Sequence, residues 1–272
     1  PNCKDIAEKG ALRIITGQNP SGGWDYKMAC DDRNDMSYAG WCMQALKAVK
    51  MAGLHPEGLD TCIKRAIACL KDCNFSQSQG FTYCGTPGQG QRPGTPGEHV
   101  YGLTGTGCLC MQLLGYASEP EVKTSLDMMR LWQPSLSKII MPNGPSGGNA
   151  QYYAYYASQC KYQAGMAAKA TKKDSATWKD WNLAMKKLYP SAIITLPEKI
   201  LDATGKEREM GYWKNEDGSG DRPVMDTCLC ALQLMVYYRY LPTTSLKASE
   251  VETDIDAASK SSDDVKVDTG NI

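Results

Sequence analysis

The chain has 272 residues, of which 30 are basic and 30 acidic, so it carries no formal net charge. Without a net charge there is no long-range field to attract nucleic acid or an anionic membrane, and we expect neither as a partner. This length suits one large hydrophobic core, and we expect a monomer with one domain over residues 1–243 and a polar tail over residues 244–272.

Four successive units of one pattern follow each other along the chain. Each unit has an amphipathic helix, a glycine-rich loop that often carries an aromatic residue, and a second helix that is apolar nearly all round. In the first unit the pattern predicts a helix over residues 6–16, a loop at 22–24 and a second helix over 35–51.

The second unit begins with an apolar stripe on one side of residues 59–70, which predicts an amphipathic helix. After a run of Gly and Pro over residues 85–97, the segment 100–118 carries no charged residue. Because this segment contains several glycines, two threonines and Gln112, we expect a helix buried in protein and no transmembrane segment.

The third unit pairs an apolar stripe over residues 122–129 with a tyrosine-rich helix over 151–165. The fourth unit pairs a helix over residues 178–188 with one over 225–240. A long insertion separates these two helices, and we expect a loop at Gly211-Tyr212-Trp213 before the last helix.

One-sided and all-round apolar helices alternate, as two nested layers require, since an inner helix contacts both the outer layer and the interior. The segment Cys-Met-Gln at 42–44 recurs at 110–112, so the second helices share a register. Small residues such as Gly40 and Gly107 allow neighbouring helices to approach closely. The sequence therefore predicts an all-α fold, an α/α toroid of about four helical hairpins with inner and outer layers, either closed or open and incomplete.

The chain contains 12 cysteines, and most of them lie inside helical patterns, where we expect them to pack as small apolar residues. The sequence leaves undecided whether one or two disulfides form among the cysteines near predicted loops, which are Cys3, Cys30, Cys73 and Cys84. Such bridges fit an exported protein. The sequence begins at Pro1, without a methionine or a leader, and we expect a bacterial protein exported to the periplasm, the cell surface or the medium.

Residues 18–24 read Gln-x-x-x-Gly-x-Trp, with Lys9-Gly10 and Ile14 upstream. This pattern resembles the QW repeat of squalene-hopene and oxidosqualene cyclases, in the terpenoid cyclase and protein prenyltransferase superfamily. The motif has a mechanical purpose: we expect the Gln18 amide to bond backbone at a helix end and the Trp24 ring to fasten the loop to its neighbour.

The second half of the chain is similar to bacterial prenyltransferase and squalene oxidase repeat proteins of unassigned activity. The similarity is carried by the tyrosines of residues 152–156, by Trp178-x-x-Trp181 and by Asp226-Thr227. It implies an α/α toroid with more hairpins than the four identified in this chain, which favours an open or incomplete ring.

The cyclases use an Asp-x-Asp-Asp cluster, in which one carboxyl must stay protonated. The nearest match is Asp31, Asp32 and Asp35, but Asn34 replaces one acid and Arg33 favours ionised neighbours. We therefore expect Asn34 or Asp35 to cap the helix that follows. Asp35 is kept as a candidate catalytic acid.

The protein prenyltransferases hold zinc through Asp-x-Cys and a distant histidine. Asp226-Thr227-Cys228 supplies the first two groups, but His55 and His99 both lie upstream. We expect Cys228 to pack in the core, and we expect no metal and no other cofactor.

The starts of the second helices and their loops meet at one end of such an architecture. Tyr and Trp rings beside a few carboxylates suit sugars or peptides, which require flat apolar faces with hydrogen-bonding tips. The candidate ligand-binding residues are Trp24, Tyr38, Tyr152, Tyr153 and Tyr156. The candidate catalytic residues are Asp35, Glu98, His99 and Asp226. Alternatively, the tyrosines fill the centre of the ring and the Glu98-His99 pair caps a helix.

Every catalytic signature of the family is incomplete in this chain. We therefore expect a non-enzymatic binding or scaffold domain that holds a peptide or a glycan at the loop end. The alternative is an enzyme that acts on an isoprenoid inside the ring or on a polysaccharide. A polysaccharide enzyme would need paired carboxylates roughly 5 to 10 Å apart in an open groove.

Overall fold

The computed structural model describes residues 2–28, 34–77, 80–85, 103–137, 140–141, 144–145, 150–170, 176–216 and 222–236. Over these residues the chain is mostly helical, as the sequence predicts. The tail over residues 244–272 lies outside the described residues, so the predicted boundary before it stays a prediction.

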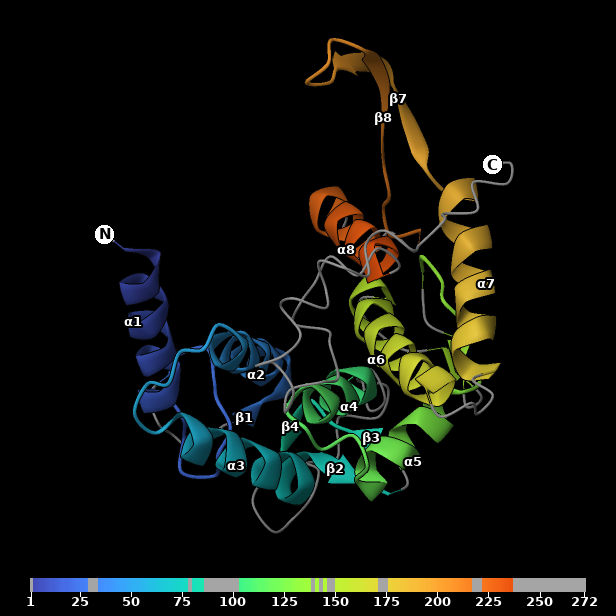
Figure 1. Cartoon of the computed structure of the whole chain (residues 1–272). Coiled ribbons are helices and arrows are strands. Elements are labelled where there is room, and N and C mark those ends of the chain that lie inside the picture. Colours follow the sequence, from blue (N-terminus) through green and yellow to red (C-terminus); the bar gives the residue numbers. More distant parts are fainter. Residues whose placement is uncertain are drawn as a thin grey trace.

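Each of the four predicted units contributes two helices to the described part of the chain (Figure 1). The α-helices are α1 (Cys3–Thr16), α2 (Met36–Met51), α3 (Leu59–Cys69), α4 (Thr104–Leu113), α5 (Pro120–Met129), α6 (Ala150–Ala170), α7 (Ala176–Ser191) and α8 (Pro223–Met235), and the π-helix η1 (Leu70–Asn74) extends α3.

The strands form two-stranded antiparallel sheets. The pairs are β1 (Asn34–Asp35) with β4 (Cys84–Gly85), β2 (Phe75–Ser76) with β3 (Gly80–Phe81), β5 (Ile140–Met141) with β6 (Gly144–Pro145), and β7 (Ile194–Leu201) with β8 (Glu207–Tyr212). The first three pairs are only two residues long.

The even-numbered helices form a continuous series of contacts. Helix α2 contacts α4, α4 contacts α6, and α6 contacts α8 (Figure 1). The odd-numbered helices α1, α5 and α7 pack against α2, α4 and α6, and α3 packs against α2.

Burial distinguishes α4 from α3 as the sequence pattern predicts, whereas α8, also predicted to be apolar nearly all round, has one side in solvent. All ten residues of α4, from Thr104 to Leu113, are buried. In α3, Leu59, Cys62 and Ile63 are buried while Asp60 and Lys64 are exposed. Helix α4 is therefore surrounded by protein, whereas α3 has one face in solvent.

Glycines set the distance between neighbouring helices. A Cβ atom at Gly40 in α2 would lie 2.5 Å from the Thr106 side chain of α4, and one at Gly107 would lie 2.2 Å from the Phe81 ring. Any larger residue at either position would push these elements apart. The predicted close approach of neighbouring helices is thus confirmed at Gly40, whereas Gly107 makes room for the Phe81 ring of β3.

Buried polar side chains also join neighbouring helices. The Gln112 Nε2 atom of α4 donates to the Cys160 carbonyl of α6 at 3.1 Å, and the Gln233 Nε2 atom of α8 donates to the Gln151 carbonyl of α6 at 3.3 Å. Lys161, only 1% exposed, donates from Nζ to a carbonyl of α5 at 2.6 Å. These bonds satisfy polar groups that water does not reach.

The β7–β8 hairpin was not predicted from the sequence. It follows α7 and projects away from the helices (Figure 1), with most of its residues exposed. Gly211 and Tyr212, expected in a loop, are the last two residues of β8. The sequence signal for this hairpin is the turn Asp202-Ala-Thr-Gly205. Its glycine is needed because residue 205 has φ +78°, a conformation that favours glycine.

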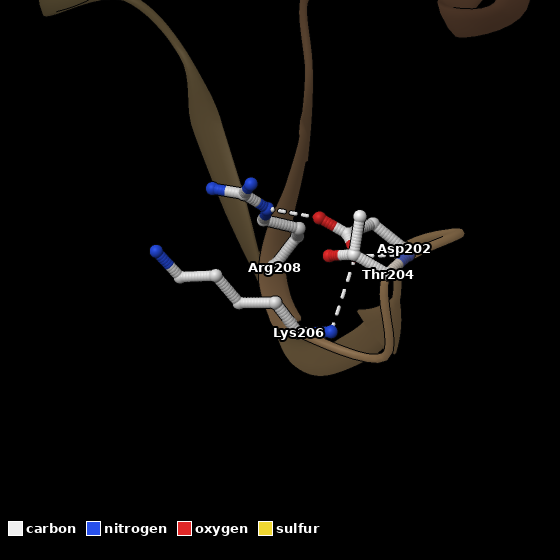
Figure 2. Close-up of polar contacts among 4 residues, drawn as sticks. All are labelled: Asp202, Thr204, Lys206 and Arg208. Carbon is white, nitrogen blue, oxygen red and sulfur yellow. Dashed lines mark hydrogen bonds and ion pairs between the residues drawn. The ribbon is translucent and has the colours of Figure 1, made fainter.

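Asp202 organises the tip of the hairpin (Figure 2). Its Oδ1 atom accepts hydrogen bonds from the Thr204 hydroxyl at 2.6 Å and from the Lys206 amide at 3.1 Å. Its Oδ2 atom accepts from Arg208 Nε at 2.7 Å. These bonds, with that to the Thr204 hydroxyl the largest effect, lower the pKa of Asp202 to about 2.

The cysteines that the structure describes with their side chains are free thiols, Cys3 and Cys73 among them. The expectation that Cys228 packs in the core is wrong. Helix α8 turns Leu229 and Cys230 toward α6, so Val224 and Cys228, four residues apart, lie on the exposed side.

The described helices include none with the length and apolar content needed to cross a bilayer.

Candidate functional site

The Gln18–Trp24 loop is fastened by both residues of its motif. The Gln18 Nε2 atom donates to the Gly22 carbonyl at 2.8 Å and to the Cys62 carbonyl of α3 at 2.9 Å. The Trp24 ring is fully buried, and its Nε1 atom donates to the Ile14 carbonyl of α1 at 2.8 Å. The Trp24 bond at the end of α1 confirms its predicted mechanical role and leaves the ring no exposed surface for a ligand, whereas Gln18 bonds a loop carbonyl and a carbonyl within α3 and not at a helix end.

The fourth unit has an equivalent fastening. The Trp213 Nε1 atom donates to the Tyr189 carbonyl of α7 at 2.9 Å. The Trp213 backbone is held by the Thr227 hydroxyl, which accepts from its amide and donates to its carbonyl. A tryptophan that precedes an even-numbered helix therefore bonds the preceding odd-numbered helix in both units.

Asp35 caps α2, as the sequence predicts. Its Oδ1 atom accepts from the Ser37 amide at 3.0 Å, the Ser37 hydroxyl at 2.6 Å and the Tyr38 amide at 3.3 Å. The carboxylate is fully buried. These contacts fix the start of α2 and thereby the two aromatic residues of its first turns, Tyr38 and Trp41.

Five aromatic residues gather around the start of α2. They are Tyr26, Tyr38, Trp41, Tyr83 and Tyr152, and they are called the aromatic face below. The ring centroids of Tyr26 and Tyr38 lie 4.9 Å apart, and the Tyr152 hydroxyl donates to the Ser37 carbonyl at 3.3 Å. Tyr26 is 63% exposed, Trp41 45% and Tyr83 39%, so three large rings reach solvent here.

A buried layer of tyrosines from α6 supports the aromatic face. Trp41 stacks on Tyr155 at 6.1 Å, and Tyr152 packs edge-on against Tyr156 at 5.0 Å. Burial raises the pKa of Tyr153, Tyr155 and Tyr156. Tyr153 and Tyr156 are thus filling residues, and of the predicted ligand-binding set only Tyr38 and Tyr152 are partly exposed.

Hydroxyl groups line the aromatic face. The hydroxyls of Tyr26 and Ser37 lie 3.3 Å apart. Burial, together with a hydrogen bond to Asp35, raises the pKa of Tyr83. The face therefore combines flat rings with neutral hydrogen-bonding tips.

The remaining candidates lie elsewhere. Asp226 is buried in the first turn of α8, where its Oδ2 atom accepts from the Asn215 amide at 3.0 Å. Glu98 and His99, as well as Asp31 and Asp32, lie outside the described residues. Among the residues that the structure does describe, no three His, Cys, Asp or Glu side chains gather in a way that could hold a metal ion.

A shallow cavity of about 200 Å³ opens at the start of α3. It is lined by His55, Pro56, Gly58, Leu59, Asp60 and Thr61. None of the exposed aromatic rings contributes to it.

Sequence reasoning missed Tyr26, Trp41 and Tyr83. Trp41 could have been found, because it lies three residues after Tyr38 and shares a helix side with it. Tyr26 and Tyr83 lie in loops without a periodic pattern, so only the fold brings them to α2.

No protein-family model, no curated protein and no solved structure matches this chain.

Proposed function

We propose that the protein is a non-enzymatic binding domain that holds a neutral glycan on its aromatic face. The scaffold that we propose is an α/α toroid of the terpenoid cyclase type, open rather than closed. The series of contacts through α2, α4, α6 and α8, with odd-numbered helices packed against it, supports this architecture.

The exposed rings of Tyr26 and Trp41 carry the functional proposal. Large aromatic side chains are normally buried, and exposed ones in a cluster mark binding surfaces. Here the cluster lies on a rigid base, because Tyr155 and Tyr156 support Trp41 from below. A preformed platform of this kind costs little entropy on binding.

The chemistry of the face favours a glycan over a peptide. Sugar rings stack their C–H groups on flat aromatic faces, and their hydroxyls pair with neutral groups such as the Ser37 and Tyr26 hydroxyls. Tyr38, Trp41 and Tyr152 of the face lie on α2 and α6, and helices offer no strand edge to which an extended peptide could add.

An enzymatic function has less support. Asp35 is engaged by three donors at the start of α2, and Asp226 accepts from the Asn215 amide. Both carboxylates are buried, so neither is presented to a substrate in solution.

The test is a titration of the full chain with neutral cello-, xylo- and chito-oligosaccharides, followed by intrinsic tryptophan fluorescence and calorimetry. We expect Trp41→Ala to weaken binding by about tenfold or more, because a ring that carries a stacking contact is lost. Leu183→Ala is the matched control, since Leu183 is 57% exposed on α7 and should leave the affinity unchanged.

Two outcomes would count against the proposal. If the oligosaccharides do not bind but a displayed peptide library yields binders that depend on Trp41, the ligand is a peptide. If Trp41→Ala binds as tightly as the unaltered protein, the aromatic face is not the binding site.

A further inference from the structure

The polar groups at the start of α2 form a chain of hydrogen bonds that begins at a buried carboxylate. Asp35 is fully buried, and its Oδ1 atom lies 2.6 Å from the Ser37 hydroxyl. A carboxylate can only accept hydrogen bonds, so the single hydrogen of the Ser37 hydroxyl points to Asp35. The amides of Ser37 and Tyr38 donate to the same oxygen at 3.0 and 3.3 Å and hold the carboxylate in place. The direction of the first bond is therefore fixed.

The second bond of the chain takes its direction from the first. The Tyr26 and Ser37 hydroxyl oxygens lie 3.3 Å apart, and by geometry alone either group could donate. Because the Ser37 hydrogen is committed to Asp35, the Ser37 oxygen has only lone pairs to offer, and Tyr26 is the donor. A tyrosine hydroxyl also carries a single hydrogen. On its outer side the Tyr26 oxygen therefore presents lone pairs.

Tyr152 has the same polarity as Tyr26. Its hydroxyl donates to the Ser37 carbonyl at 3.3 Å, and a carbonyl oxygen can only accept. Two tyrosine hydroxyls of the aromatic face, one from the loop before α2 and one from α6, thus turn their hydrogens toward Ser37. Around Ser37 the face is therefore made of hydrogen-bond acceptors.

We propose that Tyr26 determines the specificity of the aromatic face by selecting glycans that donate a hydrogen bond from a free hydroxyl. This inference rests on the proposed glycan-binding function and adds the hydrogen-bonding character of the ligand. A sugar hydroxyl can donate to the Tyr26 oxygen, whereas the oxygen of a methyl ether, a carboxylate or a sulfate can only accept and would leave both oxygens without a hydrogen between them. Tyr26 is 63% exposed, so its side chain is open to a ligand from solvent.

The test compares a neutral oligosaccharide with its fully O-methylated form. The probe is whichever cello-, xylo- or chito-oligosaccharide binds the unaltered protein most tightly in the titration above. Methylation keeps the sugar rings and the acceptor oxygens but removes the hydroxyl donors. We expect Tyr26→Phe to bind the free sugar about three- to tenfold more weakly and the methylated sugar about as tightly as the unaltered protein does. Tyr212→Phe, which alters a partly exposed tyrosine of β8, is the matched control and should change neither affinity.

Ser37→Ala gives a readout that damage to the fold would not produce. Without the Ser37 oxygen, the Tyr26 hydrogen is free to donate to a ligand that can only accept. We therefore expect the methylated sugar to bind Ser37→Ala about threefold or more tightly than it binds the unaltered protein. Adding Tyr26→Phe to Ser37→Ala should remove this gain, because the hydrogen is then absent.

The outcomes separate this inference from the proposed function. If Trp41→Ala weakens binding but Tyr26→Phe leaves the preference for the free sugar unchanged, the aromatic face binds glycans and the inference about Tyr26 is wrong. A Ser37→Ala variant that gains no affinity for the methylated sugar also overturns it, since the Tyr26 hydrogen would then not be directed by Ser37. If no oligosaccharide of the titration binds, the proposed function fails and the inference fails with it.

Discussion

Two connections in this molecule join an odd-numbered helix to the next even-numbered one and contain a tryptophan that bonds the odd-numbered helix, yet the segments before that tryptophan differ. Between α1 and α2, the Gln18–Trp24 loop is buried and bonded to α3. Between α7 and α8, the β7–β8 hairpin extends into solvent (Figure 1), and the Trp213 bond to the Tyr189 carbonyl fastens its end to α7. The comparison indicates that the tryptophan bond is what the helix pair requires, and that the length inserted before it is free to vary.

The first way to test this comparison is to remove each tryptophan. We expect Trp24→Ala to lower the free energy of unfolding by about 3 to 5 kcal/mol, because the ring is fully buried and its loss leaves a cavity and an unpaired Ile14 carbonyl. Trp213→Ala should cost less, about 1 to 2 kcal/mol, since that ring is only partly buried. Guanidinium unfolding followed by circular dichroism measures both, and equal losses would contradict the contrast between the two connections.

The helices, unlike the exposed hairpin, bury a charged side chain. Lys161 is buried against the Trp181 ring, 4.3 Å from its centroid, and burial lowers the pKa of this lysine to about 8. The unfolded chain, with the ordinary lysine pKa of 10.5, binds more protons between these two values. Raising the pH through this window therefore favours the folded state, as far as Lys161 is concerned.

A comparison with Lys161→Met isolates this effect, because the cysteines and tyrosines, which titrate in the same range, are present in both proteins. We expect the stability of the unaltered protein to rise by about 2 kcal/mol relative to Lys161→Met between about pH 7.5 and about pH 9.5. Urea unfolding of both proteins across this range measures the difference. A constant difference would mean that Lys161 titrates normally and is open to solvent.

Much of the fold could be predicted from the sequence, because burial imposes a period on helices. The uncharged segment before Ser118 predicted a buried helix, which is α4. The one-sided stripe of residues 59–70 predicted an amphipathic helix, which is α3. The bond of Trp24 to the end of α1 and the cap Asp35 were also predictable, since helix ends always need partners for their free backbone groups.

The hairpin and the aromatic face were harder to predict for a shared reason. The β7 strand has no buried side to impose alternation, and its pairing with β8 contains an irregularity between Thr195 and Lys199. Tyr26 and Tyr83 come from loops on either side of α2 and α3, and their meeting depends on the pairing of β1 with β4. Long-range pairing of this kind leaves no periodic trace in a single sequence.

The smallest expected effect on the stability of the whole protein comes from a substitution at the hairpin tip (Figure 2). Asp202→Asn removes the charge that pairs with Arg208 and weakens the turn. Because the hairpin is exposed and contributes little to the core, we expect the midpoint of global unfolding to stay unchanged while amide exchange at Thr204 and Lys206 becomes faster. Hydrogen exchange measured by NMR tests this, with Lys123, exposed in the Lys123–Asp127 ion pair of α5, altered to Gln as the control. If Asp202→Asn lowered the unfolding midpoint as Trp213→Ala does, the hairpin would be part of the cooperative unit, and the two connections would differ in shape but not in energetics.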